Sequence, residues 1–286
     1  MQITKDNLTI VIVTIKSDEV IEKCLDSIDP EVKKIIVENS SNENFIKKLK
    51  SNYKNIDFYI SGKNLGMGAG NNIGIKKSKT RYVMILNPDA VLRVDTLDQI
   101  YKGSKMLDFA ILSPISDNIN YPNFKINKKK DNLKKDLLEV DQVDGYSMII
   151  DKLKFNDNYF DENIFMYLEN DDLCLRMKKK KEKIYIFQKA LINHLGARAV
   201  NDIFSDEVEL SRNWHWCWSK FYFKKKNYSF IFALVTEFPN FIRSCLKCIF
   251  YYLTKNKFKF KIYFCRVEGF YNSLTNKKSW YRPKFD

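Results

Sequence analysis

The chain has 286 residues, and its hydrophobic content of 45% is enough for a sizeable core, which excludes a globally disordered protein. Its net charge of +14 is concentrated in residues 221–286, where 14 Lys and Arg stand against 3 Asp and Glu. This tail therefore needs an acidic partner, such as a membrane surface, a nucleic acid or a polyanionic substrate.

Strands alternate with a helix in the first sixty residues. Apolar runs predict buried strands at residues 8–14, 34–38 and 56–60, and apolar residues at helical spacing predict a helix over 20–28. Alternation of this kind is typical of a parallel sheet with helical crossovers. The expected fold class is therefore α/β.

A glycine-rich stretch at residues 64–74 follows the third strand. It matches the G-x-G-x-x-G dinucleotide fingerprint poorly, because that motif should follow the first strand. One interpretation is a loop and helix start close to a nucleotide sugar, with helix N–H groups facing phosphate. The other is tight packing of a helix on the sheet, and the two are compatible.

A strongly apolar run from Tyr82 stops at Asn87-Pro88-Asp89. Proline cannot continue the hydrogen-bond ladder, so the strand ends there. Asp89 then lies at the carboxyl edge of the sheet, where open α/β folds hold their ligands. A carboxylate there suits a divalent cation, and the cation suits a diphosphate. The alternative is that Asp89 only caps a following helix.

The middle of the chain continues the same pattern. We expect a helix over about residues 94–106, strands at 109–112 and 184–187, and strand character broken by a glycine over 140–150. The polar, lysine-rich residues 116–140 predict either a flap or a solvated surface loop.

Three carboxylates, Glu169, Asp171 and Asp172, lie within four residues at the start of a predicted helix that ends in lysines. Acids at the N-terminus and lysines at the C-terminus both interact favourably with the helix dipole. Three acids are nevertheless more than helix capping requires. A lone histidine usually has a structural role, but His194 follows the strand at 184–187 in a chain with only two histidines, which also suits a ligand.

The tail is rich in aromatic and basic residues. Residues 206–226 predict an amphipathic helix, and the apolar residues 230–253 are too interrupted by polar residues for a membrane span. One face of this second segment is apolar, and lysines follow it, which is typical of a helix in a lipid headgroup layer. The alternative is a helical appendage packed on the catalytic domain.

The six cysteines show no paired metal-ligand spacing, so we expect free thiols in a reducing compartment. The first apolar run has strand length, and no basic segment precedes it, so no signal peptide is expected. The predicted location is cytoplasmic, at the inner face of the cell membrane.

In this order the motifs resemble those of the family 2 glycosyltransferases with the GT-A fold, in particular the bacterial rhamnosyltransferase-like branch. The resemblance covers about residues 7–226. It rests on the opening strand Val11–Thr14, Val37-Glu38-Asn39-Ser40 for the family's V-D-N-x, the loop Asn64–Asn72, Leu86-Asn87-Pro88-Asp89 for its L-N-P-D metal motif, Phe160-Asp161-Glu162, the acidic motif from Glu169 to Arg176, and the late His194.

The resemblance implies a GT-A catalytic domain, which we place at residues 1–205. The pattern of the tail predicts a basic, membrane-associated helical region over 206–286. The resemblance also implies an inverting transfer of rhamnose or a hexose, from dTDP-rhamnose or a UDP-hexose, to a glycan or lipid-linked glycan in cell-surface polysaccharide synthesis. Asp89 and His194 would hold Mg²⁺ or Mn²⁺. The implied donor-binding residues are Thr14, Glu38, Asn39, Asn64, Gly66, Asn72, Asn87 and Asp89.

One departure concerns the catalytic base, because Asn170 stands where the family carries its catalytic Asp. An amide cannot accept the proton. Either a neighbouring carboxylate is the base or the motif has slid by one residue. We favour Asp171, with Asp172 and Glu169 as the other catalytic candidates. A non-catalytic glycan-binding scaffold stays open, as does a nucleic-acid-binding protein, although the latter leaves both carboxylate clusters unexplained and no nucleic-acid partner is expected.

Overall fold

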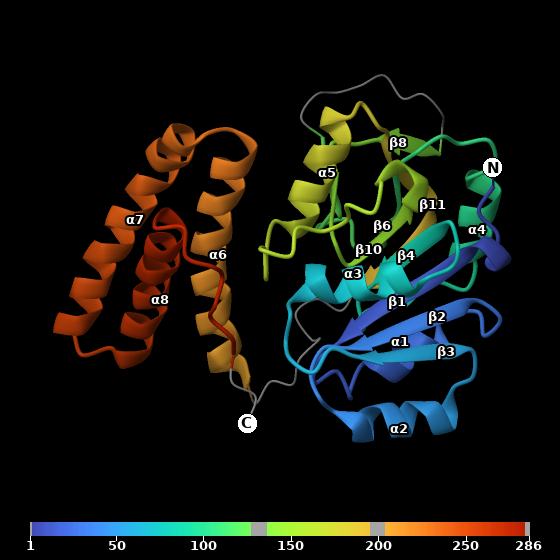
Figure 1. Cartoon of the computed structure of the whole chain (residues 1–286), viewed down its shortest axis with the longest axis horizontal. Helices are drawn as coiled ribbons and strands as arrows, with labels where there is room; N and C mark the ends of the chain where they lie inside the picture. Colours follow the sequence, from blue (N-terminus) through green and yellow to red (C-terminus); the bar gives the residue numbers. More distant parts are fainter. Residues whose placement is uncertain (1, 127–135, 195–203, 284–286) are drawn as a thin grey trace. The chain divides into compact units, whose positions relative to one another are not determined.

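The computed structural model describes residues 2–126, 136–194 and 204–283 (Figure 1). The chain forms two compact units, one of residues 1–161 and 173–201 and the other of 162–172 and 202–286. Residues 162–172 cluster with the C-terminal helices, where the carbonyl of Met166 accepts a hydrogen bond from the Ser219 hydroxyl at 2.7 Å. The predicted boundary between a catalytic domain of residues 1–205 and the tail stays a prediction.

A mixed sheet forms the centre of the first unit, with the order β3-β2-β1-β4-β10-β6-β11-β5 and with β8 beside β11. The pairs β3–β2, β2–β1 and β1–β4 are parallel, as expected, whereas β10 is antiparallel to β4 and β6. The strands are β1 (Leu8–Thr14), β2 (Lys33–Glu38), β3 (Ile56–Ile60), β4 (Tyr82–Leu86), β5 (Ala90–Leu92), β6 (Ile111–Ser116), β8 (Leu137–Glu139), β10 (Ser147–Asp151) and β11 (Ile184–His194), and a separate pair joins β7 (Phe124–Lys125) to β9 (Gln142–Val143).

Helices cover both faces of this sheet, as Figure 1 shows. Side chains of α1, α2 and α4 join one hydrophobic cluster with the sheet, and side chains of α3 and α5 join the other. The bounds are α1 (Ile21–Asp26), α2 (Glu43–Asn52), α3 (Met67–Lys77), α4 (Thr96–Gly103) and α5 (Glu169–Lys179), with short 3₁₀ turns at Lys5–Asn7 and Lys152–Lys154. The expected α/β fold class is confirmed.

The two clusters explain why the central strands are apolar throughout. In β4, Met84 faces the cluster of α1, α2 and α4, while Val83 and Ile85 face the cluster of α3 and α5. Successive strand residues point to opposite faces, so a strand covered on both sides needs apolar residues at every position.

β11 is longer than the sequence indicated. The strand predicted at 184–187 continues to His194, and its register against β6 shifts between Phe187 and Leu191. Polar Gln188 and Lys189 lie at this irregularity, so the apolar pattern breaks although the strand does not. His194 is therefore the last residue of the strand rather than part of a following loop. The predicted flap 116–140 contains β7 and β8, and its residues 127–135 lie outside the described part.

The glycines of α3 serve close packing, which confirms that interpretation of the glycine-rich stretch. A Cβ built on Gly74 would lie 2.3 Å from Cγ1 of Val11, and one on Gly70 would lie 2.8 Å from Cγ1 of Val13. Val11 is fully buried and, being β-branched, has little rotamer freedom. The helix can approach β1 this closely only without side chains at these positions.

We therefore expect Gly74→Ala to lower the free energy of unfolding by about 1–3 kcal/mol, as overpacking of a core does. In an exposed helix the same change would stabilise the protein by about 1 kcal/mol, so the sign itself is diagnostic. Urea unfolding followed by circular dichroism measures the difference. Gly70→Ala is the control and should destabilise the protein less, because Val13 is only partly buried and its side chain can move away more easily. A stabilised Gly74→Ala variant would contradict the close approach.

Three helices make up most of the second unit: α6 (Ser205–Asn227), α7 (Phe230–Leu253) and α8 (Lys257–Leu274). α6 and α7 match the two helical segments predicted at 206–226 and 230–253, whereas α8 was not predicted as a separate helix. His215 of α6 is fully buried, its Nε2 lies 2.8 Å from the Tyr281 carbonyl, and burial lowers its pKa to about 3, so it is a neutral structural residue. All six cysteines are free, as predicted.

Candidate active site

Buried polar side chains lie at the carboxyl ends of β1 and β2. Thr14 donates a hydrogen bond from Oγ1 to Oε2 of Glu38 at 2.7 Å, and the Ser40 hydroxyl donates to the other carboxylate oxygen. Glu38 is 1% exposed, and burial raises its pKa. Its carboxyl group is thus fixed at the sheet edge, at a position where the resemblance implies contact with the donor.

Asn39 connects this cluster to the glycine-rich loop. Its Oδ1 accepts a hydrogen bond from the Leu65 amide at 3.0 Å, and its Nδ2 donates to the Gly66 carbonyl at 3.2 Å and to Oδ1 of Asn64 at 3.3 Å. Gly66 has φ of 87°, which favours glycine, and it directly precedes α3. The structure therefore brings together Thr14, Glu38, Asn39, Asn64 and Gly66 of the predicted donor-binding residues.

Asn72 is used differently. Its Nδ2 donates to the Phe160 carbonyl at 2.9 Å, its Oδ1 accepts from the Phe160 amide at 3.0 Å, and the residue is 4% exposed. Both hydrogen bonds join α3 to the segment that leads into the acidic motif. These contacts give Asn72 a structural role, and its predicted contact with the donor stays a prediction.

Asp89 and His194 meet at the end of the sheet. β5 begins directly after Asp89 and pairs antiparallel with β11, which places Ala90 opposite His194. Oδ1 of Asp89 lies 3.3 Å from Nε2 of His194, and neither buried atom has a hydrogen-bond partner among the described residues. Because a strand rather than a helix follows Asp89, the alternative that Asp89 caps a helix is wrong.

This pair fits a divalent cation that the substrate helps to hold. Among the described residues, no group of three or more His, Cys, Asp or Glu could bind a metal without help. Mg²⁺ and similar ions are commonly held by one or two carboxylates together with substrate phosphates and water. Two buried ligand atoms that face each other without hydrogen bonds are what such a partial site requires.

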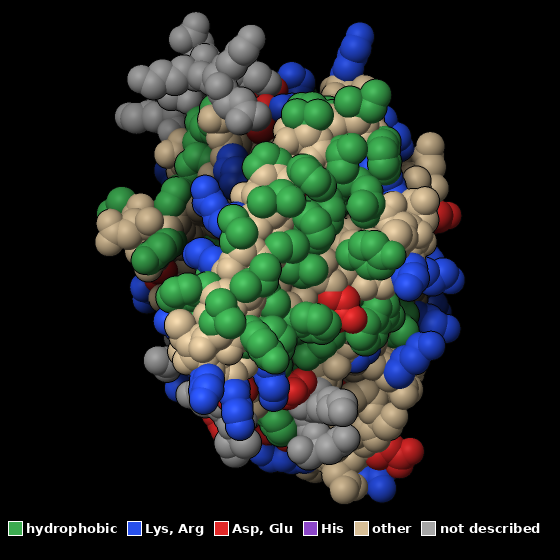
Figure 2. All heavy atoms as spheres, turned by 90° about the vertical axis from the view of Figure 1, so that its left-hand side faces the viewer, with side chains coloured by type: hydrophobic (Ala, Val, Ile, Leu, Met, Phe, Trp, Pro, Cys, Tyr) green, Lys and Arg blue, Asp and Glu red, His purple; other side chains and the backbone are tan. Residues whose placement is uncertain are grey.

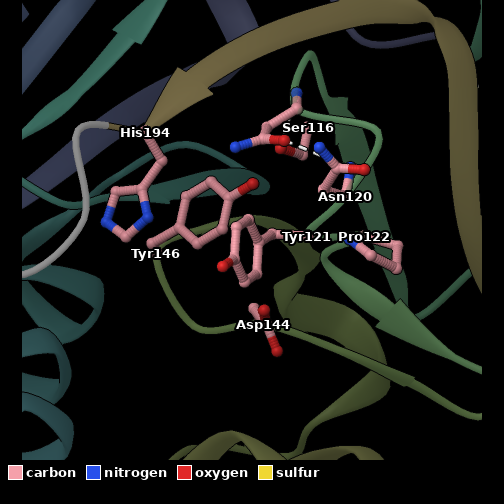
Figure 3. Close-up of a pocket in the computed structure, with 8 residues that line it drawn as sticks. Ser116, Asn120, Tyr121, Pro122, Asp144, Tyr146 and His194 are labelled. Atoms are coloured by element: carbon pink, nitrogen blue, oxygen red, sulfur yellow. Dashed lines mark hydrogen bonds between the residues drawn. The ribbon is translucent and has the colours of Figure 1, made fainter.

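A pocket of about 560 Å³ opens beside His194 (Figure 3). The Tyr146 ring stacks on the His194 imidazole with centroids 4.0 Å apart and planes 6° apart. Burial raises the pKa of Tyr146 to about 12, so its hydroxyl stays neutral. Polar side chains and aromatic rings together suit a sugar. The lining residues are Ser116, Asn118, Asn120, Tyr121, Pro122, Asp144, Tyr146 and His194.

Sequence reasoning missed this pocket because most of its residues lie in the predicted flap or beside the glycine that breaks residues 140–150. The break itself was a usable signal. Gly145 separates β9 from β10, and the carbonyl of the next residue, Tyr146, accepts a hydrogen bond from the Asn87 amide at 2.8 Å. That bond ties the pocket wall to the Asn87-Pro88-Asp89 turn.

The acidic motif is in the second unit as far as residue 172, and its carboxylates have different surroundings. Asp172 is fully buried, with Oδ2 2.8 Å from the Lys226 ammonium and Oδ1 3.0 Å from the Asn227 amide. Glu169 is 6% exposed, and its Oε2 has no hydrogen-bond partner in the described residues. Asp171 is half-buried. Sequence reasoning missed Lys226 and Asn227, which are more than fifty residues away along the chain.

The backbone in front of these acids is strained. Tyr167 and Leu168 both have positive φ, 67° and 69°, a region that costs residues other than glycine about 1–2 kcal/mol each. The Tyr167 ring packs edge-on against Trp216 with centroids 5.4 Å apart. Strain of this kind is concentrated at functional sites, where the surroundings enforce it. Here it turns the chain directly before Glu169.

Burial raises the pKa of Glu169 from its usual 4.5 to about 7. A carboxyl group with a raised pKa stabilises the folded state below its unfolded pKa, and this contribution is lost as the pH rises through about 7. We therefore expect the free energy of unfolding of the wild type to fall by up to about 3 kcal/mol between pH 5 and pH 8.5. The Glu169→Gln variant, which has no carboxyl group at this position, should not show this fall. Urea unfolding at both pH values tests this. Parallel pH profiles of the two proteins would contradict the raised pKa.

Comparison with known proteins gives a consistent result. The family described as Glycosyl transferase family 2 matches residues 9–194. The low-salt glycan biosynthesis hexosyltransferase Agl10 of Haloferax volcanii is 27% identical in an alignment 204 positions long, which covers 63% of this chain and 64% of Agl10. The rhamnosyltransferase WbbL of Escherichia coli K12 is 30% identical in an alignment 203 positions long, which covers 59% of this chain and 75% of WbbL. The match thus spans slightly less than two thirds of Agl10.

Two solved structures show the same fold. GalNAc-T7, crystallised with UDP, GalNAc and Mn²⁺, superposes with a TM-score of 0.54 at 12% identity, covering 80% of this chain and 56% of that one. S. aureus TarS 1-349 superposes with a TM-score of 0.53 at 13% identity, covering 96% and 93%. At these identities the likeness concerns the fold alone, which is GT-A.

Proposed function

Since the chain belongs to the glycosyl transferase family 2, we propose that it transfers a sugar from a nucleotide-sugar donor to a glycan or lipid-linked glycan. The resemblance to this family and to its rhamnosyltransferase-like branch, expected from the motifs, is confirmed. The observation that carries the proposed activity is the Asp89–His194 pair, two buried ligand atoms 3.3 Å apart at the sheet edge.

The donor is proposed to be dTDP-rhamnose or a UDP-hexose, because one relative is a rhamnosyltransferase and another a hexosyltransferase. The hydrogen-bonded cluster of Thr14, Glu38 and Asn39 would hold the nucleoside. Asp89 and His194 would hold Mg²⁺ or Mn²⁺, and Mn²⁺ with UDP is present in the GalNAc-T7 crystal structure. When bound, such a cation supplies positive charge that stabilises the departing nucleotide diphosphate.

A sugar ring is proposed to occupy the pocket beside His194. The side chains of Asn118, Asn120 and Asp144 offer hydrogen-bond donors and acceptors for hydroxyl groups, and Tyr121 and Tyr146 offer ring faces. Because His194 both lines the pocket and faces Asp89, the pocket adjoins the proposed diphosphate position.

The reaction is proposed to be a single displacement with inversion. The acceptor oxygen forms a bond to the anomeric carbon, the bond from that carbon to the diphosphate breaks, and the acceptor proton passes to a carboxylate. We assign this role to Asp171, a half-buried carboxylate in the first turn of α5 that directly follows position 170, where the family carries its catalytic Asp. Both oxygens of Asp172 are engaged by Lys226 and Asn227, so Asp172 is proposed to hold the motif in place.

A lipid-linked acceptor would bring the reaction to a membrane. We therefore propose that residues 1–205 form the catalytic domain and that the basic residues 206–286 keep the enzyme at the inner face of the cell membrane, as a peripheral protein of cell-surface polysaccharide synthesis. The acidic partner of the tail is then an anionic membrane surface rather than nucleic acid.

A non-catalytic glycan-binding role is the second candidate, and Asn170 at the family's catalytic position favours it. A donor screen separates the two. Purified protein is incubated with dTDP-rhamnose and with UDP-hexoses, with and without Mn²⁺, and nucleotide release is scored. Metal-dependent release of the nucleotide from one donor would support the glycosyltransferase. If the protein binds glycans but releases nucleotide from no donor, the non-catalytic glycan-binding role is the better explanation.

A further inference from the structure

α7 presents an apolar stripe to solvent. Seven large residues recur in steps of three and four along its length, so they share one face of the helix. Their exposed fractions run from 41% to 72%, and the stripe is about 33 Å long at 1.5 Å per residue. The residues are Ile231, Val235, Phe238, Ile242, Leu246, Ile249 and Leu253.

Most of the large apolar side chains of α7 are not used for packing within the helical unit. The buried residues of α7 are the small or polar Ala233, Glu237 and Ser244, and the larger Leu234 and Phe241 are partly buried against Phe221 and Phe270. The stripe lies outside this contact and is exposed. Figure 2 shows hydrophobic side chains gathered over this face of the helical unit. Single exposed apolar residues are ordinary, but a continuous apolar surface marks a site of interaction with a protein or a membrane.

The charges beside the stripe are positive. Arg243 and Lys247 of α7 are exposed, and four lysines at positions 255, 257, 259 and 261 surround the start of α8. Glu237 is 4% exposed and forms an ion pair with Lys224. The other acid of α7 and α8, Glu268, accepts a hydrogen bond from the Trp214 indole at 3.1 Å. Both acids are thus engaged within the helical unit, and the exposed rim is basic.

We propose that α7 lies flat in the headgroup layer of an anionic lipid bilayer, with this stripe facing the acyl chains. An apolar stripe with a basic rim is typical of helices that lie in the membrane interface, where each nearby Lys or Arg adds attraction to an anionic surface. No helix in the described ranges is long and apolar enough to cross the bilayer.

A second copy of the chain fits this face less well than a bilayer does. If two stripes packed on each other, the lysines of one copy would meet those of the other, and like charges across an interface disfavour association. Anionic headgroups neutralise the same lysines. The docking face rests on α7 and α8 alone, so it stands whether or not the proposed sugar transfer is correct.

The test is co-sedimentation of the full chain with vesicles that contain about 30 mol% phosphatidylglycerol, next to vesicles of phosphatidylcholine alone. The stripe variant carries Leu246→Glu and Ile249→Glu. Its matched control is Met106→Glu, which changes an 88% exposed apolar residue outside the tail. We expect the wild type and the control to bind the anionic vesicles, and the stripe variant to bind at least about tenfold more weakly.

Three further readouts decide between occupants. Binding of the wild type should weaken in about 0.5 M NaCl, because salt screens the lysines. Circular dichroism should show the stripe variant folded, since both side chains are 58% or more exposed. Light scattering should give the same mass for wild type and variant. Equal vesicle binding by both proteins, or a wild-type dimer that the stripe variant abolishes together with no vesicle binding, would overturn the proposal.

Discussion

Asp89→Asn is expected to lower sugar transfer by about a hundredfold to a thousandfold while leaving the fold intact, as the loss of one preorganised electrostatic group typically does. Asn has nearly the same shape but lacks the negative charge that a hard cation prefers as a ligand. Asp89 lies in the turn between β4 and β5, and its Oδ1 makes no hydrogen bond within the described residues, so the substitution removes little of the packing.

Two measurements check this expectation. Nucleotide release gives the activity, and calorimetry with UDP in the presence and absence of Mn²⁺ shows whether the metal still strengthens binding. Asp98→Asn, which removes an exposed carboxylate from α4, is the control and should behave as wild type. A folded Asp89→Asn variant with near wild-type turnover would show that the carboxylate does not serve the diphosphate.

Asp171→Asn is expected to lower kcat by about 10²–10⁴ with little change in donor affinity, because a general base acts mainly in the transition state. Asn170→Ala should have a much smaller effect, since an amide cannot accept the proton. Asp172→Asn would act through its bonds to Lys226 and Asn227, so its loss of activity should come with a loss of stability.

Glu169→Gln and Asn170→Asp are the comparisons that can move the assignment. If Glu169→Gln abolishes turnover while Asp171→Asn is neutral, the buried Glu169, with its pKa of about 7, is the base. If Asn170→Asp raises the rate and Asp171→Asn is neutral, the catalytic position is 170 and the natural chain is a specialised member of its family. Single-turnover rates of the four variants with one donor decide between these outcomes.

The sequence predicted the fold because the sheet is built from local signals. β1, β2 and β4 are covered on both faces, so their central residues form apolar runs, and Pro88 marks the end of β4. The Asp89 turn could be placed at the carboxyl edge for the same reason. His194 could be named as a candidate ligand, which stays a prediction, but its position as the last residue of β11 was hidden by the polar irregularity at residues 188–189.

What the sequence did not predict depends on contacts between distant residues. The hydrogen bonds of Asn72 to Phe160, and of Lys226 and Asn227 to Asp172, join positions more than fifty residues apart. No propensity or spacing rule encodes such pairs. The pocket wall at Tyr146 likewise depends on the register of β10 against β4. The sequence could therefore identify candidate residues, but it could not show which of them form hydrogen bonds that hold the fold together.

The configuration at the anomeric carbon of the product tests the central claim most directly. Wild-type protein, the donor that supports nucleotide release, Mn²⁺ and a lipid-linked glycan acceptor are incubated together, and the new linkage is examined by proton NMR. A single displacement at the Asp89–His194 site predicts one new glycosidic bond whose anomeric configuration is opposite to that of the donor. A product with the donor's configuration, or nucleotide release without any new linkage, would contradict the account.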